Sequence, residues 1–525
     1  MQIGVIVYPD PKLLVWPDSI GYLGPAVDAL ERGYFSHWYG RAYPYPLFLL
    51  GLLSISPEPV TIVYAQRALV FATYVALAST VWLLARHAAR NRLASPLSLA
   101  IVSGTWLLIY IFYPPTLFLA HAVMAETLFS FLLAVVMLAM TAAGLPETSV
   151  RARGWAIAVA CVVSVLVLLV RPHWLVAGFL VPLLLVWLAP PGQRRRVAVV
   201  AAVASLSSFL VLVLPEKSLQ GKYDAYTSKV FGPKTLFCNS ADLVHDYLAR
   251  AKQDDFNDQV RASLAQFLTP GARAAAAVEG WGRQGFNGDK CVYGGTAELV
   301  SQRFARDPGA EASYYFDLYL RAVAYRPGYL VHRLGTQLAS LGGRLFPGVA
   351  SAYSISHRTV ADSRDLRRLY EQWVSGRKYD LIGLVETPFV GWETELSASY
   401  FVAGAVLASA LVAFLLHVTS SLLRGIPTTA IQRHGAAALM LGIAINGLIA
   451  VVHTFDVWRY ASMQAPLFTL LGVISFVALG NFWKGRNALR TALDESPQGG
   501  TIQQALSSPT RDCDDQDIDN ITRVQ

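Results

Sequence analysis

Charged residues are scarce in this sequence. They make up 15 % of its 525 residues, whereas soluble proteins average about 25 %. Together with 54 % hydrophobic residues and a mean hydropathy of +0.42, this shortage indicates a membrane protein. The net charge of +8 does not indicate nucleic-acid binding, because the basic residues lie in short loops between apolar runs. No internal repeat is evident. A signal peptide is not expected either, because residues 1–9 lack a basic start and the run "IGVIV" is too short.

Apolar runs of roughly 17–25 residues are typical of membrane-spanning helices. Two runs, 155–170 and 173–189, are separated only by "RPHW" and together are too long for one crossing. We therefore expect two antiparallel helices there rather than one kinked helix. The fold class expected is an all-α polytopic membrane protein with about nine spans, namely 60–86, 96–113, 122–143, 155–170, 173–189, 197–214, 398–423, 435–453 and 461–483.

Arginine and lysine in alternate loops predict the orientation, since positive residues favour the cytoplasmic face. If these spans are right, one face carries Arg86, Arg90, Arg92, Arg151, Arg153, Arg194, Arg195, Arg196, Arg424, Arg433, Lys484, Arg486 and Arg490. That face is expected to be cytoplasmic. The less basic face then holds the first segment, the "RPHW" turn, a long loop and "HTFDVWRY".

The long loop, residues 215–393, is too long for a simple connection. Helical spacing of apolar residues in "TLFCNSADLVHDYLARA" and a second pattern broken at Pro327 favour a mostly helical outer domain. The polar tail is expected to be disordered. The expected division is 1–57 for a first outer loop with a short interfacial helix, 58–214 for an N-terminal transmembrane module, 215–393 for the extracytoplasmic domain, 394–484 for C-terminal transmembrane helices and 485–525 for a cytoplasmic tail.

Only four cysteines are present, and two of them, Cys238 and Cys291, lie in the outer loop. An oxidising compartment would let these two form a disulfide. The alternative is two unrelated buried thiols.

Charges inside the spans are also scarce, and an intramembrane charge is a functional hint. The clearest are Arg67 and Glu126, each within about two turns of the outer end of its span. The absence of a midplane charge argues against a transporter, whose site usually lies at the midplane. Polar residues gather instead at the less basic face, namely Asp18, His37, Arg41, Arg67, His121, Glu126, Arg171, His173, His453, Asp456 and Arg459. Any one of these residues is about equally well explained as an anchor at the membrane interface. Their concentration is not explained in this way, because the positive-inside rule disfavours arginines on that face.

The first segment contains a short helix that is expected to lie at the membrane surface. Pro25 suits its first turn and Gly33 its C-terminal cap. An apolar stripe is expected on one face and charged residues elsewhere, the stripe being Val27, Leu30 and Tyr34 and the charges Asp28, Glu31 and Arg32. Asp18, just before this helix, can act as a general base on a hydroxyl; a turn or cap role is equally compatible with the local sequence.

The pattern Asp18, Tyr22, Ala26, Leu30, Gly33, followed by "YPYPLFLLGLL", resembles the first outer loop of the polytopic glycosyltransferases of the C superfamily. This superfamily includes the mannosyl- and aminoarabinose-transferases that use polyprenyl-phosphate sugars. The resemblance continues in "HAVMAETLFSFLLA", "LLVRPHWLVAGFLVPLLL" and "HTFDVWRYASMQAPLFTLL", and so covers residues 15–215 and 395–483. The outer loop resembles no family we can name.

The resemblance implies inverting transfer of a sugar from a polyprenyl-phosphate donor to a cell-envelope lipid, glycan or protein on the outer face of a membrane, the bacterial inner membrane being expected. Asp18 is then the base, and arginines stabilise the leaving phosphate. Arg67, Arg171 and Arg459 are the candidates for that role. Glu126 orients the acceptor or pairs with an arginine, and His37 and Tyr43 line the sugar site. The full set of candidate substrate-binding residues is Tyr22, His37, Arg41, Tyr43, Arg67, Glu126, Arg171, His173, His453, Asp456, Arg459 and Tyr460.

Two features depart from the family pattern. Many members have Asp-Glu where this chain has Asp18-Ser19. Members also have a membrane helix before this loop, and only a short segment precedes Asp18 here. A tenth span upstream would restore the family's cytoplasmic N-terminus; otherwise the protein works without that helix.

Two other function classes stay open. A lipid-linked oligosaccharide polymerase or ligase also has many spans, a large outer loop and outer arginines, and the segment from Asp18 to Tyr22 argues against it. A lipid flippase or transporter is disfavoured by the absence of midplane charge. A divalent metal is compatible with sugar transfer, but the sequence shows no clean ligand spacing for one.

Overall fold

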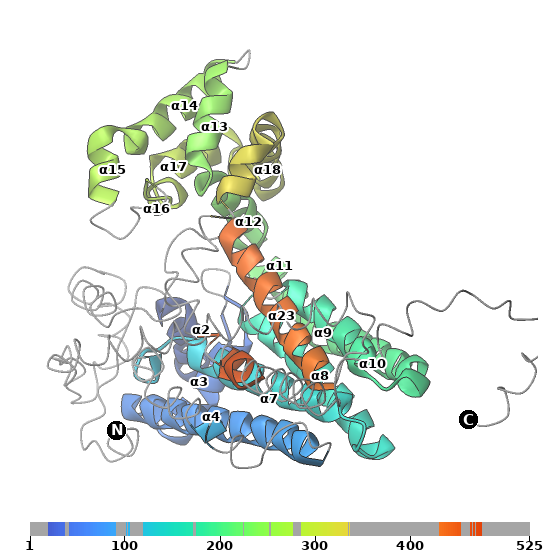
Figure 1. The fold of residues 1–525 in the computed structure, drawn as a ribbon. Helices are drawn as coiled ribbons and strands as arrows, with labels where there is room; N and C mark the ends of the chain where they lie inside the picture. The colour runs from blue at the N-terminus through green and yellow to red at the C-terminus, as the bar shows by residue number, and fades with distance from the viewer. Residues whose placement is uncertain are drawn as a thin grey trace, which may run out of the picture.

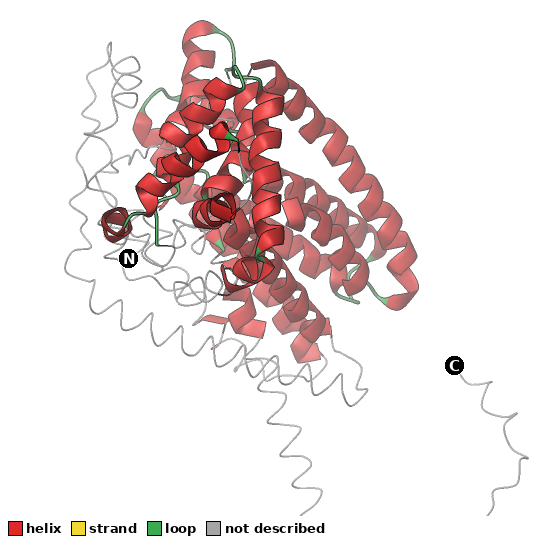
Figure 2. Cartoon of the chain, turned by 90° about the horizontal axis from the view of Figure 1, so that it is seen from above, coloured by secondary structure: helices red, strands yellow, loops and turns green. Residues whose placement is uncertain are grey.

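The structure is a computed structural model. It describes residues 19–36, 41–90, 119–171, 175–223, 225–250, 254–276, 285–333 and 430–452, residue 335, and a few residues within 101–104 and 463–474. The elements of this described part are helices, which form a bundle and a second group of helices beside it (Figures 1 and 2). The expected all-α class is therefore confirmed for the described residues. The span 398–423, the tail 485–525 and most of the spans 96–113 and 461–483 lie outside them.

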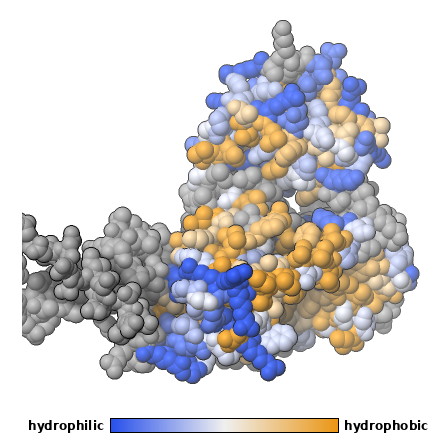
Figure 3. Space-filling view, turned by 90° about the vertical axis from the view of Figure 1, so that its right-hand side faces the viewer, coloured by the Kyte–Doolittle hydropathy of each residue, from blue (hydrophilic) through white to orange (hydrophobic). Residues whose placement is uncertain are grey.

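Four helices are long and apolar enough to cross a membrane within the described part. They coincide with the expected spans 60–86, 122–143, 155–170 and 197–214, and they cover Val60–Arg90, Glu126–Gly144, Val150–Val170 and Pro191–Ser218. These residues belong to α4 (Pro59–Arg90), α7 (Glu126–Gly144), α8 (Val150–Val170) and the continuous run from η3 (Pro191–Gln193) through α10 (Arg194–Ser208) and η4 (Phe209–Val213) into α11 (Leu214–Tyr223). On the face seen in Figure 3, the bundle carries broad apolar patches with hydrophilic residues between and below them.

Proline and capping residues set the ends of these helices. Pro59 begins α4, where its missing N–H would have no partner. Ser149 caps α8 by accepting a hydrogen bond from the Ala152 N–H at 3.3 Å. Arg171 ends α8 because Pro172 follows it and disfavours the helical conformation at the preceding residue.

Two further apolar helices of the described bundle lie near expected spans. The spans 155–170 and 173–189 are two separate helices, α8 and α9 (Leu175–Leu188), which contact each other. The span 435–453 corresponds to α23 (Ala430–Val452), which packs on α9. The alternative of a single kinked helix is wrong.

The basic residues of these helices gather at one end of the bundle. Arg86 and Arg90 lie in the last turns of α4, Arg194 begins α10, and Nη1 of Arg433 lies 3.5 Å from the Leu188 carbonyl. Arg153 was expected in a loop, but α8 begins five residues earlier than expected, so Arg153 is helical. It is buried and donates to the carbonyls of Ala143 at 2.9 Å and Leu145 at 2.8 Å, at the C-terminal end of α7.

The first segment forms α2 (Ile20–Arg32) and α3 (Pro44–Ile55), which pack together. Gly33 ends α2 in the left-handed region, with φ +71°, as the sequence predicted. Pro25, however, lies inside the helix rather than in its first turn, because α2 already begins at Ile20. Its start is held by the buried Ser19, whose hydroxyl donates to the Val123 carbonyl at 2.9 Å.

The expected faces of this short helix are corrected by the structure. Val27 is buried, but Leu30 and Tyr34 are exposed, and the buried stripe contains Tyr22, Leu23 and Ala26 instead. Asp28 is buried too, because its carboxylate accepts a hydrogen bond from Ser36 at 2.5 Å and lies 3.4 Å from Arg32.

A second group of helices follows α11 and has its own apolar core. It comprises α12 (Ala225–Cys238), α13 (Ala241–Arg250), α14 (Asp255–Leu268), α15 (Pro270–Ala276), α16 (Asp289–Val292), α17 (Gly295–Arg303) and α18 (Pro308–Tyr325). Phe237, Phe286 and Tyr315 are fully buried in this core. α18 ends two residues before Pro327, as that proline predicted. The group lies beyond the upper end of α23 in Figure 1.

A disulfide joins this second group of helices. Cys238 ends α12 and Cys291 lies in α16; their sulfurs are bonded, and both residues are fully buried. The bond closes a loop with a sequence separation of 53 residues.

Replacing Cys238 and Cys291 together by serine is expected to destabilise the second group of helices by about 3–4 kcal/mol, because the unfolded chain regains the entropy of the closed loop. Thermal unfolding in detergent measures this, and peptide maps with and without reductant should differ at these two residues. Cys513→Ser in the tail is the control. Alkylation of both thiols in untreated membranes would contradict the bond.

Candidate functional site

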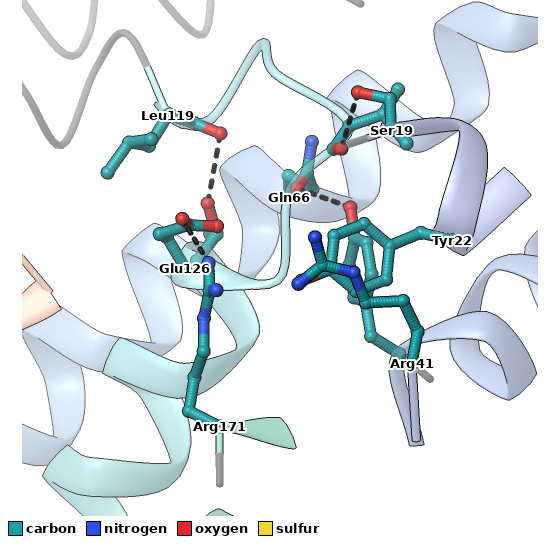
Figure 4. A network of polar contacts seen from close by, with 10 residues as sticks. Ser19, Tyr22, Arg41, Gln66, Leu119, Glu126 and Arg171 are labelled. Atoms are coloured by element: carbon teal, nitrogen blue, oxygen red, sulfur yellow. Dashed lines mark hydrogen bonds and ion pairs between the residues drawn. The ribbon is translucent and has the colours of Figure 1, made fainter. Parts of the chain in front are cut away.

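A polar cluster lies at the end of the bundle opposite the basic residues. α4 and α7 begin at this end, and α8 ends there. The cluster comprises seven side chains, namely Tyr22, Arg41, Gln66, Arg67, His121, Glu126 and Arg171. Three pairs among them are in contact: Tyr22 with Arg41, Arg67 with His121, and Glu126 with Arg171. Figure 4 shows most of them, with Arg171 reaching Glu126 and Arg41 lying at Tyr22.

Residues 119–125, here called the wall segment, form one side of the cluster. The sequence predicted helix from residue 122, but the helix begins only at Glu126. Three side chains bind carbonyls of the wall segment instead. Thr127 donates to Leu119 at 3.1 Å, Gln66 to Ala122 at 2.8 Å and Ala120 at 3.3 Å, and Ser19 to Val123 at 2.9 Å. These distant partners favour the irregular backbone over another helical turn.

Glu126 and Arg171 form a buried ion pair. Glu126 is fully buried and Arg171 is 3 % exposed, and Nη2 of Arg171 contacts Oε1 of Glu126. The carboxylate lies in the first turn of α7 and the guanidinium at the C-cap of α8. Each charge thus lies where the helix dipole favours it. The pair links α7 to α8, which is one of the two roles left open for Glu126.

Arg41 is held by an aromatic pair. Its guanidinium carbon lies 5.0 Å from the centre of the Tyr22 ring, and Nη1 lies 3.4 Å from the Tyr22 hydroxyl. Tyr22 packs edge-on against the buried Tyr45, with ring centres 5.1 Å apart. The cation–π contact with Tyr22 thereby positions Arg41 beside α2.

Tyr43 connects the cluster to the long helical run that ends in α11. Its backbone N–H donates to Oε2 of the buried Glu216 at 3.3 Å. The π-helical turn η4 precedes Glu216 and packs Leu212 and Val213 near Ala42. An extra residue in a helical turn re-aims the side chains after it, and π-turns are frequent at functional sites.

Arg67 is the most distinctive cation of the cluster. It is 6 % exposed, and its Nη2 lies 3.1 Å from Nε2 of His121. Its Nε and Nη1 are buried and have no hydrogen-bond partner among the described residues. Leaving a buried charged donor unsatisfied is costly, so an acceptor, and above all an anion, is the expected ligand here.

Tyr22 contacts Arg41 and Glu126 contacts Arg171, whereas Tyr43 and Arg67 contact residues outside the chosen set. Six of the residues chosen from the sequence thus lie at this end of the bundle. They are Tyr22, Arg41, Tyr43, Arg67, Glu126 and Arg171. Seven others lie outside the described residues and stay predictions, namely Asp18, His37, His173, His453, Asp456, Arg459 and Tyr460.

Four contributing residues were missed by the sequence reasoning, namely Ser19, Tyr45, Gln66 and Glu216. Gln66 carries no charge and so does not stand out within its span, although an uncharged polar residue beside Arg67 in an apolar run is a signal that could have identified it. Glu216 was assigned to the outer loop. Tyr45 was seen only as part of a motif, and Ser19 only as a departure from the family pattern.

No group of three or more His, Cys, Asp or Glu side chains is placed to hold a metal ion within the described ranges. Asp18 and Asp456 lie outside those ranges, so the sequence-based view of a divalent metal is unchanged.

Comparison with known proteins gives limited similarity. No family model matches the chain, and no curated protein matches it. Two solved structures resemble it: ArnT from Cupriavidus metallidurans in the apo state, at 13 % identity and a TM-score of 0.32 over 95 % of this chain and 80 % of that one, and the same protein bound to undecaprenyl phosphate, at 13 % identity and 0.31 over 94 % and 79 %. TM-scores this low do not establish a common fold, so the family remains a proposal that the chain's own residues must support.

Proposed function

We propose that this protein is an inverting membrane glycosyltransferase that moves a sugar from a polyprenyl-phosphate donor to a cell-envelope acceptor on the outer face of the membrane. The observation that carries the proposal is Arg67, a buried guanidinium with two nitrogens that lack a hydrogen-bond partner in the described part of the chain. The sequence motifs around Asp18 supply the resemblance to the family.

In the proposed reaction, the acceptor hydroxyl oxygen attacks the anomeric carbon opposite the phosphate, and the bond between that carbon and the phosphate oxygen breaks. Asp18 takes the hydroxyl proton as general base. The leaving polyprenyl phosphate gains negative charge, and N–H groups of Arg67 donate to it. Guanidinium suits this role because it presents several donors in a planar fork and stays charged.

The observed ion pair changes the proposed role of Arg171. A carboxylate already lies against its guanidinium, so we assign Arg171 to holding α7 and α8 together. Arg41, at the Tyr22 ring, is a second cation for the donor phosphate, and Arg459 remains a candidate from the sequence. His37, Tyr43, His173, His453, Asp456 and Tyr460 are proposed for the sugar and the acceptor.

The charge distribution supports the outer location. The basic residues Arg86, Arg90, Arg153 and Arg194 lie at the end of the bundle away from the polar cluster, and positive residues favour the cytoplasmic side. The cluster then faces outward, on the side of the second group of helices. The reaction is thus proposed at the outer mouth of the bundle in the inner membrane.

Product analysis tests the reaction class. Purified protein in vesicles is supplied with labelled polyprenyl-phosphate sugars and an envelope lipid fraction. A transferase adds one sugar, a polymerase makes a ladder, and a flippase forms no new glycosidic bond. A ladder, or transport without transfer, would overturn the proposal.

Arg67→Gln is expected to weaken donor binding by about tenfold to a hundredfold, because each lost hydrogen bond to a charged group contributes about 1.5–3 kcal/mol. Arg67→Lys should fall between this variant and wild type, since it keeps the charge but not the fork. Arg86→Gln, at the opposite end of α4, is the matched control. Donor titrations that do not distinguish Arg67→Gln from Arg86→Gln would return Arg67 to the role of an interface anchor.

A further inference from the structure

Gln66 occupies the junction between α3, α4 and the wall segment. It is fully buried, and its carboxamide makes three hydrogen bonds to partners far away in the sequence. Oε1 accepts from the Tyr45 hydroxyl at 3.0 Å, while Nε2 donates to the carbonyls of Ala122 at 2.8 Å and Ala120 at 3.3 Å. The two carbonyls can only accept, so they fix which end of the amide faces the wall segment.

The wall segment in turn carries the partner of Arg67. His121 lies between the two residues whose carbonyls Gln66 holds, and its Nε2 is 3.1 Å from Nη2 of Arg67. A guanidinium only donates, so this contact requires Nε2 of His121 to accept and places the ring proton on Nδ1. The imidazole thereby fixes one nitrogen of the Arg67 fork.

Gln66 and Arg67 are consecutive on α4, so their side chains leave the helix about 100° apart. The Gln66 side chain binds the wall segment, and the Arg67 side chain contacts His121 of that segment. The same helical turn therefore sets both sides of the contact between Arg67 and His121.

We propose that Gln66 is a positioning residue for the phosphate-binding arginine: it holds the wall segment on α4 so that His121 orients the Arg67 fork toward its anion. The proposal rests on the function assigned to Arg67 above and deepens it. The role of Gln66 is indirect, acting through His121. A side chain that is only structural would stabilise the fold without affecting how tightly a phosphate binds.

Gln66→Met tests this role, because methionine has similar length and flexibility but neither donates nor accepts the three strong bonds. Farnesyl phosphate is titrated into the purified full-length protein in detergent, and amide hydrogen exchange is followed in residues 119–125. We expect binding about tenfold weaker, equivalent to one hydrogen bond to a charged group, and several-fold faster exchange in the wall segment.

Thr80→Val is the matched control. Thr80 is a fully buried polar residue of the same helix, but among the described residues its hydroxyl donates only to the Ala76 carbonyl of its own helix, at 2.8 Å. This variant should bind farnesyl phosphate like wild type. Tyr45→Phe separates the two ends of the amide: it removes the bond to Oε1, keeps both carbonyl bonds, and should leave exchange in residues 119–125 within about twofold of wild type.

The outcomes distinguish failure of this inference from failure of the proposed function. If Arg67→Gln weakens binding while Gln66→Met binds normally or leaves exchange in residues 119–125 unchanged, Gln66 is not a positioning residue. If wild type does not bind farnesyl phosphate, or Arg67→Gln binds it normally, the phosphate site itself is wrong, and this inference falls with it. If Gln66→Met does not fold, His121→Ala is the deciding variant. It keeps the hydrogen bonds between Gln66 and the backbone carbonyls of the wall segment, so normal binding of farnesyl phosphate by this variant would show that Gln66 does not act on Arg67 through His121.

Discussion

Replacing Asp18 by asparagine is expected to lower sugar transfer by about 10²–10⁴-fold, the usual contribution of a general base. This corresponds to roughly 3–5 kcal/mol of activation free energy. The substitution removes one negative charge at nearly constant volume, so folding and membrane insertion should persist. Donor binding should be unchanged or slightly tighter, because an anion beside the phosphate is lost. The measurement is the initial rate of transfer in donor-supplied membranes.

The choice of control for Asp18 depends on the structure. Asp28 in α2 was expected to face away from the core, but it is buried and accepts a hydrogen bond from Ser36, so its substitution would affect folding. Glu31, exposed on the same helix, is the suitable control, and Glu31→Gln should retain wild-type transfer within a few-fold. A normal rate in Asp18→Asn would leave Asp18 as a turn residue and direct the search for the base to Asp456.

Replacing Glu126 by glutamine is expected to destabilise the bundle by about 3–5 kcal/mol, because the Arg171 charge then stays buried without its carboxylate. The loss should appear as a lower midpoint of thermal unfolding in detergent. Removing both charges in Glu126→Gln/Arg171→Met should recover much of this stability, since replacing a buried pair costs far less than breaking it.

An exposed ion pair provides the comparison for this effect. Asp317 and Arg321 of α18 are 2.9 Å apart, and both side chains are more than half exposed. Asp317→Asn should leave the unfolding midpoint nearly unchanged, because solvent screens such pairs. If Glu126→Gln unfolds at the wild-type temperature, the contact with Arg171 does not hold α7 and α8 together, and Arg171 becomes available again as a phosphate ligand.

The consequence for function is that Arg67 and Arg171 have different proposed roles. From the sequence, Arg67 and Arg171 were equivalent candidates for the leaving phosphate. In the structure, Arg171 faces a carboxylate, whereas Arg67 faces an imidazole and keeps two nitrogens without hydrogen-bond partners in the described part. The variants above therefore predict opposite signatures: loss of donor binding at Arg67 and loss of stability at Glu126 and Arg171.

The sequence by itself determined the features that depend on local chemistry. The apolar runs at α4, α7 and α8, the left-handed cap at Gly33 and the end of α18 before Pro327 all follow from hydropathy or from backbone restrictions of single residues. The concentration of arginines at one end of these helices could equally be predicted from the sequence. The bonded cysteines were the pair that shared the expected outer compartment.

Only the tertiary structure decided how polar groups pair. Glu126 pairs with Arg171, which is 45 residues away in the sequence. Ser19 donates to the carbonyl of Val123, 104 residues away, and Gln66 binds the wall segment, which is more than 50 residues away. Such contacts replace a predicted helical turn at residues 122–125 and fix the start of α2 before Pro25. Hydropathy and propensity are properties of neighbouring residues, whereas a buried hydrogen bond depends on which distant group packing brings within about 3 Å, and that choice is made by the whole bundle.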